Sequence, residues 1–366
     1  MFLGECQLTE EALHLVSNRP FAFGLSPEQY AGHHVPSLAE WEELWKAWDT
    51  VTLGMIPEHE LLSKPIDLRN PCVFYLGHIP TFLDSLLAQG GGFEPIEPKY
   101  RDIFQRGIDP DVDDPTQCHK HSSIPQSWPA LSEILEYTEN VRDRIRGILK
   151  SEVEAPLLRR AIWTGFEHEA MHLETLLYML VQSDSTLPPP GVIRPDFSSE
   201  RRKDSGEIAW HKIPDTTITV GIDDPEDPEL TTPHHFGWDN EKPAHSPTTV
   251  QAFSTRNPIT NSEYVTFLHD TSSSTFPASW VSTTTPIKGL DAFLANTTVR
   301  TIFGPVPLAH ALDWPATASY DELSACAAYL GGSIPTADQV RAIYAYVDAG
   351  KQTEKKLSGK FSAVNG

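Results

Sequence analysis

The sequence predicts a chain of two parts, a four-helix bundle followed by an irregular α+β domain. Three observations predict this division. Apolar residues recur at helical spacing between 37 and 186, prolines and polar residues interrupt that pattern at 187–205, and short β-rich segments occupy 206–366. Residues 1–36 are expected to form an N-terminal extension. A chain of 366 residues is long enough for two compact units, each with its own core.

Four helices are expected in the first part. The first covers 37–48, where tryptophans and leucines follow a capping serine at helical spacing. The second covers 71–90 and stops at a run of three glycines, with Pro80 expected to kink it or to start a new turn. The third covers 131–149 and the fourth covers 156–180. Amphipathic helices of this length pack most simply as a bundle.

The second part is predicted from mixed signals. The segment 216–220 is rich in β-branched residues, and brief helix signals occur at 261–269 and 320–330. Frequent proline and glycine separate these segments. Such a pattern is typical of an irregular α+β domain.

Composition excludes several functions. Fifty acidic against 28 basic residues give a net charge of −22, and such a surface repels nucleic acid and anionic membranes. No apolar stretch approaches the ~20 residues that cross a bilayer, and the first residues lack a secretory signal pattern. The 4 cysteines include no C-x-x-C pair, which argues against a disulfide scaffold or a cysteine zinc site. A cytoplasmic protein is expected.

Two histidines in the fourth helix form the strongest chemical signal. His168 and His172 are four residues apart, so they project from one helical face and can chelate a single metal ion. Alternatively, they are ordinary helix histidines with satisfied hydrogen bonds. His78 is the one polar residue in an apolar stretch of the second helix, and an imidazole in a core needs a partner. These three residues are candidate metal ligands.

The same segment also matches H-E-x-x-H, the signature of zinc peptidases, in which Glu169 would be the general base. A metzincin needs a glycine and a third histidine shortly after the second, and neither follows here. A thermolysin-like enzyme needs a glutamate on a helix downstream, yet 183–190 breaks the chain. The zinc peptidase is therefore the least favoured interpretation.

One histidine on the second helix and H-x-x-x-H-x-E on the last resemble the DinB-like bundle of the iron enzymes of ergothioneine biosynthesis. This resemblance implies that His78, His168 and His172 bind Fe(II). It also implies that Glu174 lies behind the ligands, where a carboxylate could orient an imidazole. Three facial histidines leave positions for a thiolate and O2, which suits iron, although spacing alone also permits zinc.

The second part resembles the formylglycine-generating-enzyme-like domain, also called the sulfatase-modifying factor domain, a variant of the C-type lectin fold. The resemblance follows one order along the chain, through 236–245, 250–253, 257–267, 276–280, 311–315 and 319–336. A DinB-like bundle followed by such a domain resembles the hercynylcysteine sulfoxide synthases, in their fungal form. The resemblance implies oxidative joining of a cysteine-type thiol to the imidazole of hercynine, with Fe(II) and O2.

Two departures from this family are expected to matter. No glycine-rich strand-to-helix turn of a methyltransferase is present, and the sequence ends before the segment that supplies the catalytic tyrosine in the family. The second domain is therefore expected to be incomplete and turnover impaired. An ovothiol-type synthase acting on histidine remains an alternative, and the thiol donor is either cysteine or γ-glutamylcysteine. The sequence assigns no catalytic proton donor and no substrate-binding residue.

Overall fold

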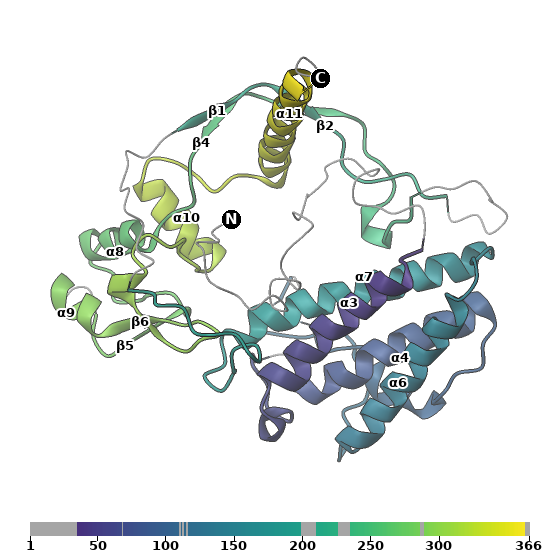
Figure 1. The fold of residues 1–366 in the computed structure, drawn as a ribbon. Helices are drawn as coiled ribbons and strands as arrows, with labels where there is room; N and C mark the ends of the chain where they lie inside the picture. Colours follow the sequence, from purple (N-terminus) through teal and green to yellow (C-terminus); the bar gives the residue numbers. More distant parts are fainter. Residues whose placement is uncertain are drawn as a thin grey trace.

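The computed structural model describes residues 35–67, 69–109, 111, 113–114, 116–198, 210–225, 235–285 and 289–362. Nearly all of the predicted N-terminal extension, and the end of the predicted linker, lie outside these residues. Figure 1 shows a helical part, drawn in purple to teal, and a second part of short strands and helices in green to yellow.

Four long helices form the helical part, as the apolar periodicity predicted. The helix α4 (Cys72–Gly91) packs against α6 (Leu131–Ile148) and α7 (Pro156–Leu180), and α3 (Leu38–Asp49) packs against α7. One continuous apolar core contains side chains from all four helices. A π-helical turn, Thr50–Met55, follows α3 directly.

Local signals explain the ends of these helices. The Ser37 hydroxyl accepts a hydrogen bond from the backbone N–H of Glu40, whose carboxylate accepts one from the Ser37 N–H, so a capping box starts α3. The helix α4 continues through Pro80 as one helix. It ends at Gly92 with a φ of 66°, a left-handed conformation that glycine adopts without strain.

The second part contains small antiparallel sheets and short helices. The strand β1 (His211–Ile213) pairs with β4 (Phe253–Thr255), and β2 (Thr216–Ile218) pairs with β3 (Thr248–Val250). A third sheet has the order β5 (Trp280–Ser282), β6 (Thr297–Val299), β7 (Val306–Pro307). A helical domain followed by a domain with small sheets therefore agrees with the predicted architecture at this level.

Short helices and one long helix complete the second part. The helix α8 (Asn261–Asp270) packs against α10 (Tyr320–Tyr329), and α9 (Leu290–Ala295) packs against a 3-10 turn at Leu308–His310. The last helix, α11 (Ala337–Ser362), packs on β1, β2 and β3. A second apolar core lies here, with Tyr264, Trp280 and Phe293 among its buried side chains. Within the described residues, no helix is both long and apolar enough to span a bilayer.

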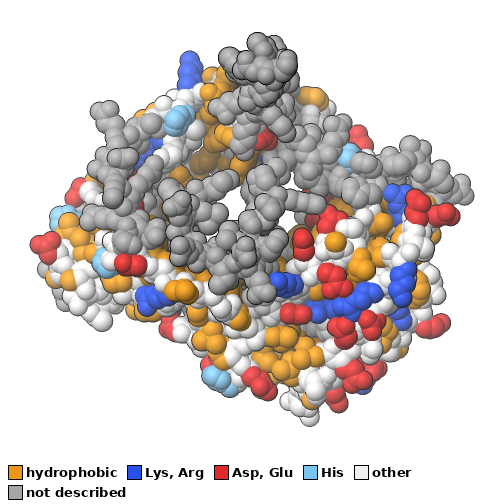
Figure 2. Space-filling model, in the orientation of Figure 1, with side chains coloured by type: hydrophobic (Ala, Val, Ile, Leu, Met, Phe, Trp, Pro, Cys, Tyr) orange, Lys and Arg blue, Asp and Glu red, His pale blue; other side chains and the backbone are white. Residues whose placement is uncertain are grey.

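One contact between the two parts lies along the first half of α7. Both guanidinium NH groups of Arg160 donate hydrogen bonds to Asp224, at 2.5 and 2.6 Å. One turn further along α7, the Trp163 ring lies 5.8 Å from that of Phe236 and 6.3 Å from that of Trp238. Figure 2 shows acidic and basic side chains interspersed over the helical part on the side drawn.

Candidate metal centre

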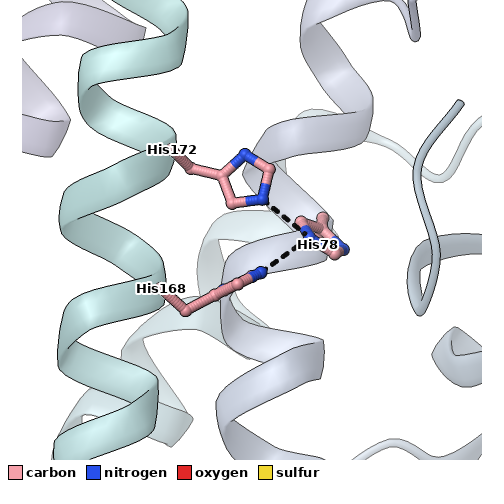
Figure 3. Close-up of side chains that lie close together, drawn as sticks. All are labelled: His78, His168 and His172. Carbon is pink, nitrogen blue, oxygen red and sulfur yellow. Dashed lines mark hydrogen bonds between the residues drawn. The ribbon is translucent and has the colours of Figure 1, made fainter. Parts of the chain in front are cut away.

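Three histidines converge inside the helical part. His78 comes from the middle of α4, while His168 and His172 come from successive turns of α7 (Figure 3). The Nε2 atom of His78 lies 3.1 Å from that of His168 and 3.2 Å from that of His172. Within the described residues, these three form the one group of potential ligands in which all donor atoms lie within 4.8 Å. The structure thus brings together the three predicted candidates.

Close approach of α4 and α7 makes this convergence possible. The two helices are each other's main packing partners in the helical part. Gly90 on α4 faces the backbone of α7, because an added Cβ would lie 2.6 Å from the carbonyl oxygen of Leu157. A larger residue there would push the helices apart, so this glycine helps keep the two sets of imidazoles within reach of one ion.

The separation of the nitrogen atoms fits a common metal ion. Imidazole nitrogens bind first-row metals at about 2.0–2.1 Å, which places two ligands about 3.0 Å apart at a right angle and about 3.4 Å apart at the tetrahedral angle. The observed 3.1 and 3.2 Å lie between these values. The donor set therefore fits a divalent metal that accepts three nitrogen ligands and keeps further positions open.

Burial keeps all three imidazoles neutral at physiological pH. It lowers the pKa of His78 to about 4 and that of His172 to about 3. Burial, followed by the proximity of the other two histidines, holds the pKa of His168 well below its usual value. Neutral imidazoles are the form that donates a lone pair to a metal.

The second ring nitrogens of the three histidines differ in their surroundings. The Nδ1 atom of His78 lies 2.6 Å from the backbone carbonyl oxygen of Phe104. A carbonyl only accepts, so this contact requires a hydrogen on Nδ1 and leaves the Nε2 lone pair free. The Nδ1 atoms of His168 and His172 are buried and have no hydrogen-bond partner among the described residues.

Aromatic rings enclose the centre. The Phe82 ring stacks on His168 at 3.7 Å, and the Phe74 ring stacks on His78 at 5.0 Å. Both phenylalanines lie four residues from His78 on α4. Sequence reasoning did not single them out, although the i±4 spacing around a buried histidine could have done so.

Glu169, the residue on which the zinc peptidase interpretation depends, lies outside the histidine group. Its carboxyl is buried and hydrogen-bonds Trp45 of α3. Burial raises the pKa of Glu169 to about 8, and the nearby Arg142 opposes this rise. Arg142 itself donates two hydrogen bonds to Asp49, at 2.7 and 2.9 Å. Glu169 thus faces α3 and α6 and is not placed as a base beside the candidate ligands.

Glu174 was predicted to orient a ligand imidazole. The structure places it on the exposed side of α7, two residues after His172. Among the described residues it makes no hydrogen bond or ion pair, whereas the carbonyl of Phe104 does contact a ligand ring. No contact among the described residues therefore supports the role predicted for Glu174.

Comparison with known proteins supports this picture of the helical part. Residues 38–183 match the DinB superfamily. The chain is 49% identical, over 97% of its length, to ergothioneine biosynthesis protein 1 of Neurospora crassa, of which it covers 44%. It is 33% identical, over 84% of its length, to ergothioneine biosynthesis protein 1 of Schizosaccharomyces pombe, of which it covers 42%. The chain thus spans less than half the length of these curated relatives.

Proposed function

The chain is homologous, over nearly its whole length, to part of ergothioneine biosynthesis protein 1, and we propose that it acts in ergothioneine biosynthesis as a non-haem iron(II) enzyme of the sulfoxide synthase type. The convergence of the Nε2 atoms of His78, His168 and His172 is the observation that carries this proposal. These residues would hold the metal. Iron(II) there would offer one ion to both a thiolate and O2.

The proposed reaction joins a cysteine-type thiol to the imidazole of hercynine. A carbon–sulfur bond forms, and the sulfur is oxidised to a sulfoxide. Dioxygen supplies one atom to the sulfoxide, and its other atom leaves as water with the hydrogens lost by the thiol and the imidazole carbon. Cysteine and γ-glutamylcysteine are the candidate thiols.

The residues of the chain supply uncharged ligands for the metal, hold those ligands in place and exclude water from one side of the centre. Three neutral imidazoles add no charge to the ion, so a bound cation keeps its full attraction for a thiolate. The stacked rings of Phe74 and Phe82 hold His78 and His168 and limit water at that side of the centre. Buried apolar surroundings also strengthen electrostatic interactions with a charged substrate.

We propose that residues 206–366 form a formylglycine-generating-enzyme-like domain that presents the imidazole substrate, and that 37–186 and 187–205 are the bundle and the linker. The small antiparallel sheets and the order of motifs support this assignment. The ion pair between Asp224 and Arg160 also supports it, because this pair holds the second part against α7. Arg160 lies eight residues before His168 on that helix, which is about 12 Å along its axis.

The test is a reconstitution assay. The protein, loaded anaerobically with Fe(II), is exposed to O2 with hercynine and either cysteine or γ-glutamylcysteine, and products are identified by mass spectrometry. We expect a hercynine-derived sulfoxide that disappears in His78→Ala, with His245→Ala, an exposed histidine, as the control. A product from histidine alone would assign the ovothiol type. No product despite bound iron would contradict synthase activity in this chain.

A further inference from the structure

The residue before His78 is a glycine whose lack of a side chain makes room for Phe104. A Cβ added to Gly77 would lie 2.5 Å from two carbons of the Phe104 ring and closer still to a third. Real Cβ atoms essentially never approach that closely. Phe104 therefore lies directly on the backbone of α4, one residue away from a candidate ligand.

The ring of Phe104 also packs against other aromatic rings. It is fully buried, it stacks with the Trp128 ring at 5.7 Å, and it meets the Tyr100 ring edge-on at 5.3 Å. Close packing of this kind leaves a side chain little freedom to move aside. We therefore expect a side chain at Gly77 to displace the Phe104 ring and, with it, the Phe104 backbone.

The backbone of Phe104 is what His78 contacts. Its carbonyl oxygen lies 2.6 Å from Nδ1 of His78. Neither His168 nor His172 has a partner for Nδ1 among the described residues. Of the three candidate ligands, only His78 therefore has its tautomer set by such a contact. Outer contacts of this type hold the ring and raise its strength as a ligand.

We propose that Gly77 and Phe104 are positioning residues for the metal centre. The absence of a side chain at Gly77 leaves the space that the Phe104 ring occupies, and the Phe104 carbonyl then fixes His78 as the tautomer with a free lone pair on Nε2. This inference rests on the proposed metal site and adds the device that orders its ligands. It does not require Gly77 or Phe104 to touch the metal or a substrate.

The decisive variant is Gly77→Ala. Alanine normally stabilises a helix relative to glycine, so a loss of metal affinity would come from the collision with Phe104 and not from helix propensity. We expect Fe(II) to bind roughly 10- to 100-fold more weakly, the usual effect of losing an outer contact to a ligand. Gly147→Ala is the matched control, because a Cβ at this position in α6 meets nothing within 4 Å. It should leave affinity unchanged.

Two further measurements separate positioning from general damage. Nitrogen-15 NMR of the metal-free protein, with His78 assigned from His78→Gln, should show the Nδ1-protonated tautomer in the wild type and a mixture in Gly77→Ala. The double variant Gly77→Ala/Phe104→Leu, which places a smaller side chain beside residue 77, should regain most of the lost affinity for Fe(II). Circular dichroism verifies that each variant is folded.

The outcomes are distinguishable. A wild type that binds no metal would overturn the proposed function, while the tautomer measurement would still test the positioning. Native affinity and a native tautomer in Gly77→Ala would overturn the positioning, as would a folded double variant with no recovery. Should Gly77→Ala fail to fold, Phe104→Ala decides, because it removes the whole ring that packs on Gly77: a mixed tautomer supports the inference, and an unchanged one overturns it.

Discussion

Asp224 accepts two hydrogen bonds from Arg160, and this ion pair joins the second part of the chain to the helix that carries His168 and His172. The Asp224 side chain is completely buried, and the backbone N–H of Gly237 donates a third hydrogen bond to it at 2.9 Å. A second ion pair between the parts, Arg300 with Asp184, differs because Asp184 is 85% exposed. The two pairs allow a matched comparison.

Asp224→Ala should destabilise the protein by about 2–5 kcal/mol, because it leaves the partly buried Arg160 without its counter-charge. Asp184→Ala removes an exposed pair and should cost less than about 1 kcal/mol. Chemical denaturation followed by tryptophan fluorescence measures both. Equal effects of the two variants would show that the Asp224 pair does not anchor the second part.

Metal binding should depend on all three histidines. His78→Ala, His168→Ala and His172→Ala each remove one nitrogen ligand, and we expect Fe(II) affinity to fall by more than about 100-fold, beyond the effect of losing an outer contact. Anaerobic equilibrium binding, with iron content measured after gel filtration, gives the result. Glu174→Ala is the informative companion, because its exposed side chain makes no described contact and affinity should not change. Unchanged iron content in His78→Ala would remove this residue from the site.

The metal-free protein should lose stability as pH falls below about 6.5. The pKa of His78 and that of His172 are lowered to about 4 and about 3, so the unfolded state binds more protons than the folded state between these values and 6.5. The stability of the folded state is thus fully kept above pH 6.5. On acidification below that value, the free energy of unfolding falls by about 1.4 kcal/mol per pH unit for each histidine. Urea denaturation at several pH values tests this. His78→Gln should flatten the profile, and an equally steep profile in that variant would contradict the assignment.

Glu169 should have the opposite pH dependence. Burial raises its pKa from 4.5 to about 8, so it is mostly protonated in the folded protein at pH 7. The stability that this protonated carboxyl contributes is fully present below about pH 4.5 and is lost progressively as pH rises from there to about 8. Glu169→Gln mimics the protonated form, so its stability should match that of the wild type to within about 1 kcal/mol near pH 4.5 and exceed it increasingly as pH rises toward 8. Above pH 8 the variant should be more stable than the wild type. The variant should also keep its Fe(II), whereas peptidase activity dependent on Glu169 would support the zinc peptidase instead.

Sequence reasoning predicted the helices of the bundle and the three histidines because both follow from local patterns. Apolar spacing specifies α4 and α7, and two histidines four apart must share a helical face. The contact between Phe104 and His78 was not predicted, since a backbone carbonyl 26 residues away is positioned by tertiary packing. The interpretation of Glu174 came from a motif, yet a residue two positions after His172 points about 200° away around a helix.

Limited proteolysis should cut first between residues 183 and 205 or within the second part, and leave a resistant bundle. The helical part has one continuous core with side chains from four helices, whereas the core of the second part is smaller. The segment after α7 has no regular structure in its described residues and is rich in proline, and exposed backbone of this kind admits proteases. On α11, Tyr344, Tyr346 and Val347 remain 41–48% exposed. Little apolar surface is therefore buried between that helix and the strands on which it packs. Mass spectrometry should therefore find a fragment that retains His78, His168 and His172 and still binds Fe(II). Initial cleavage within α4 or α7 would show instead that the bundle depends on the second part for its stability.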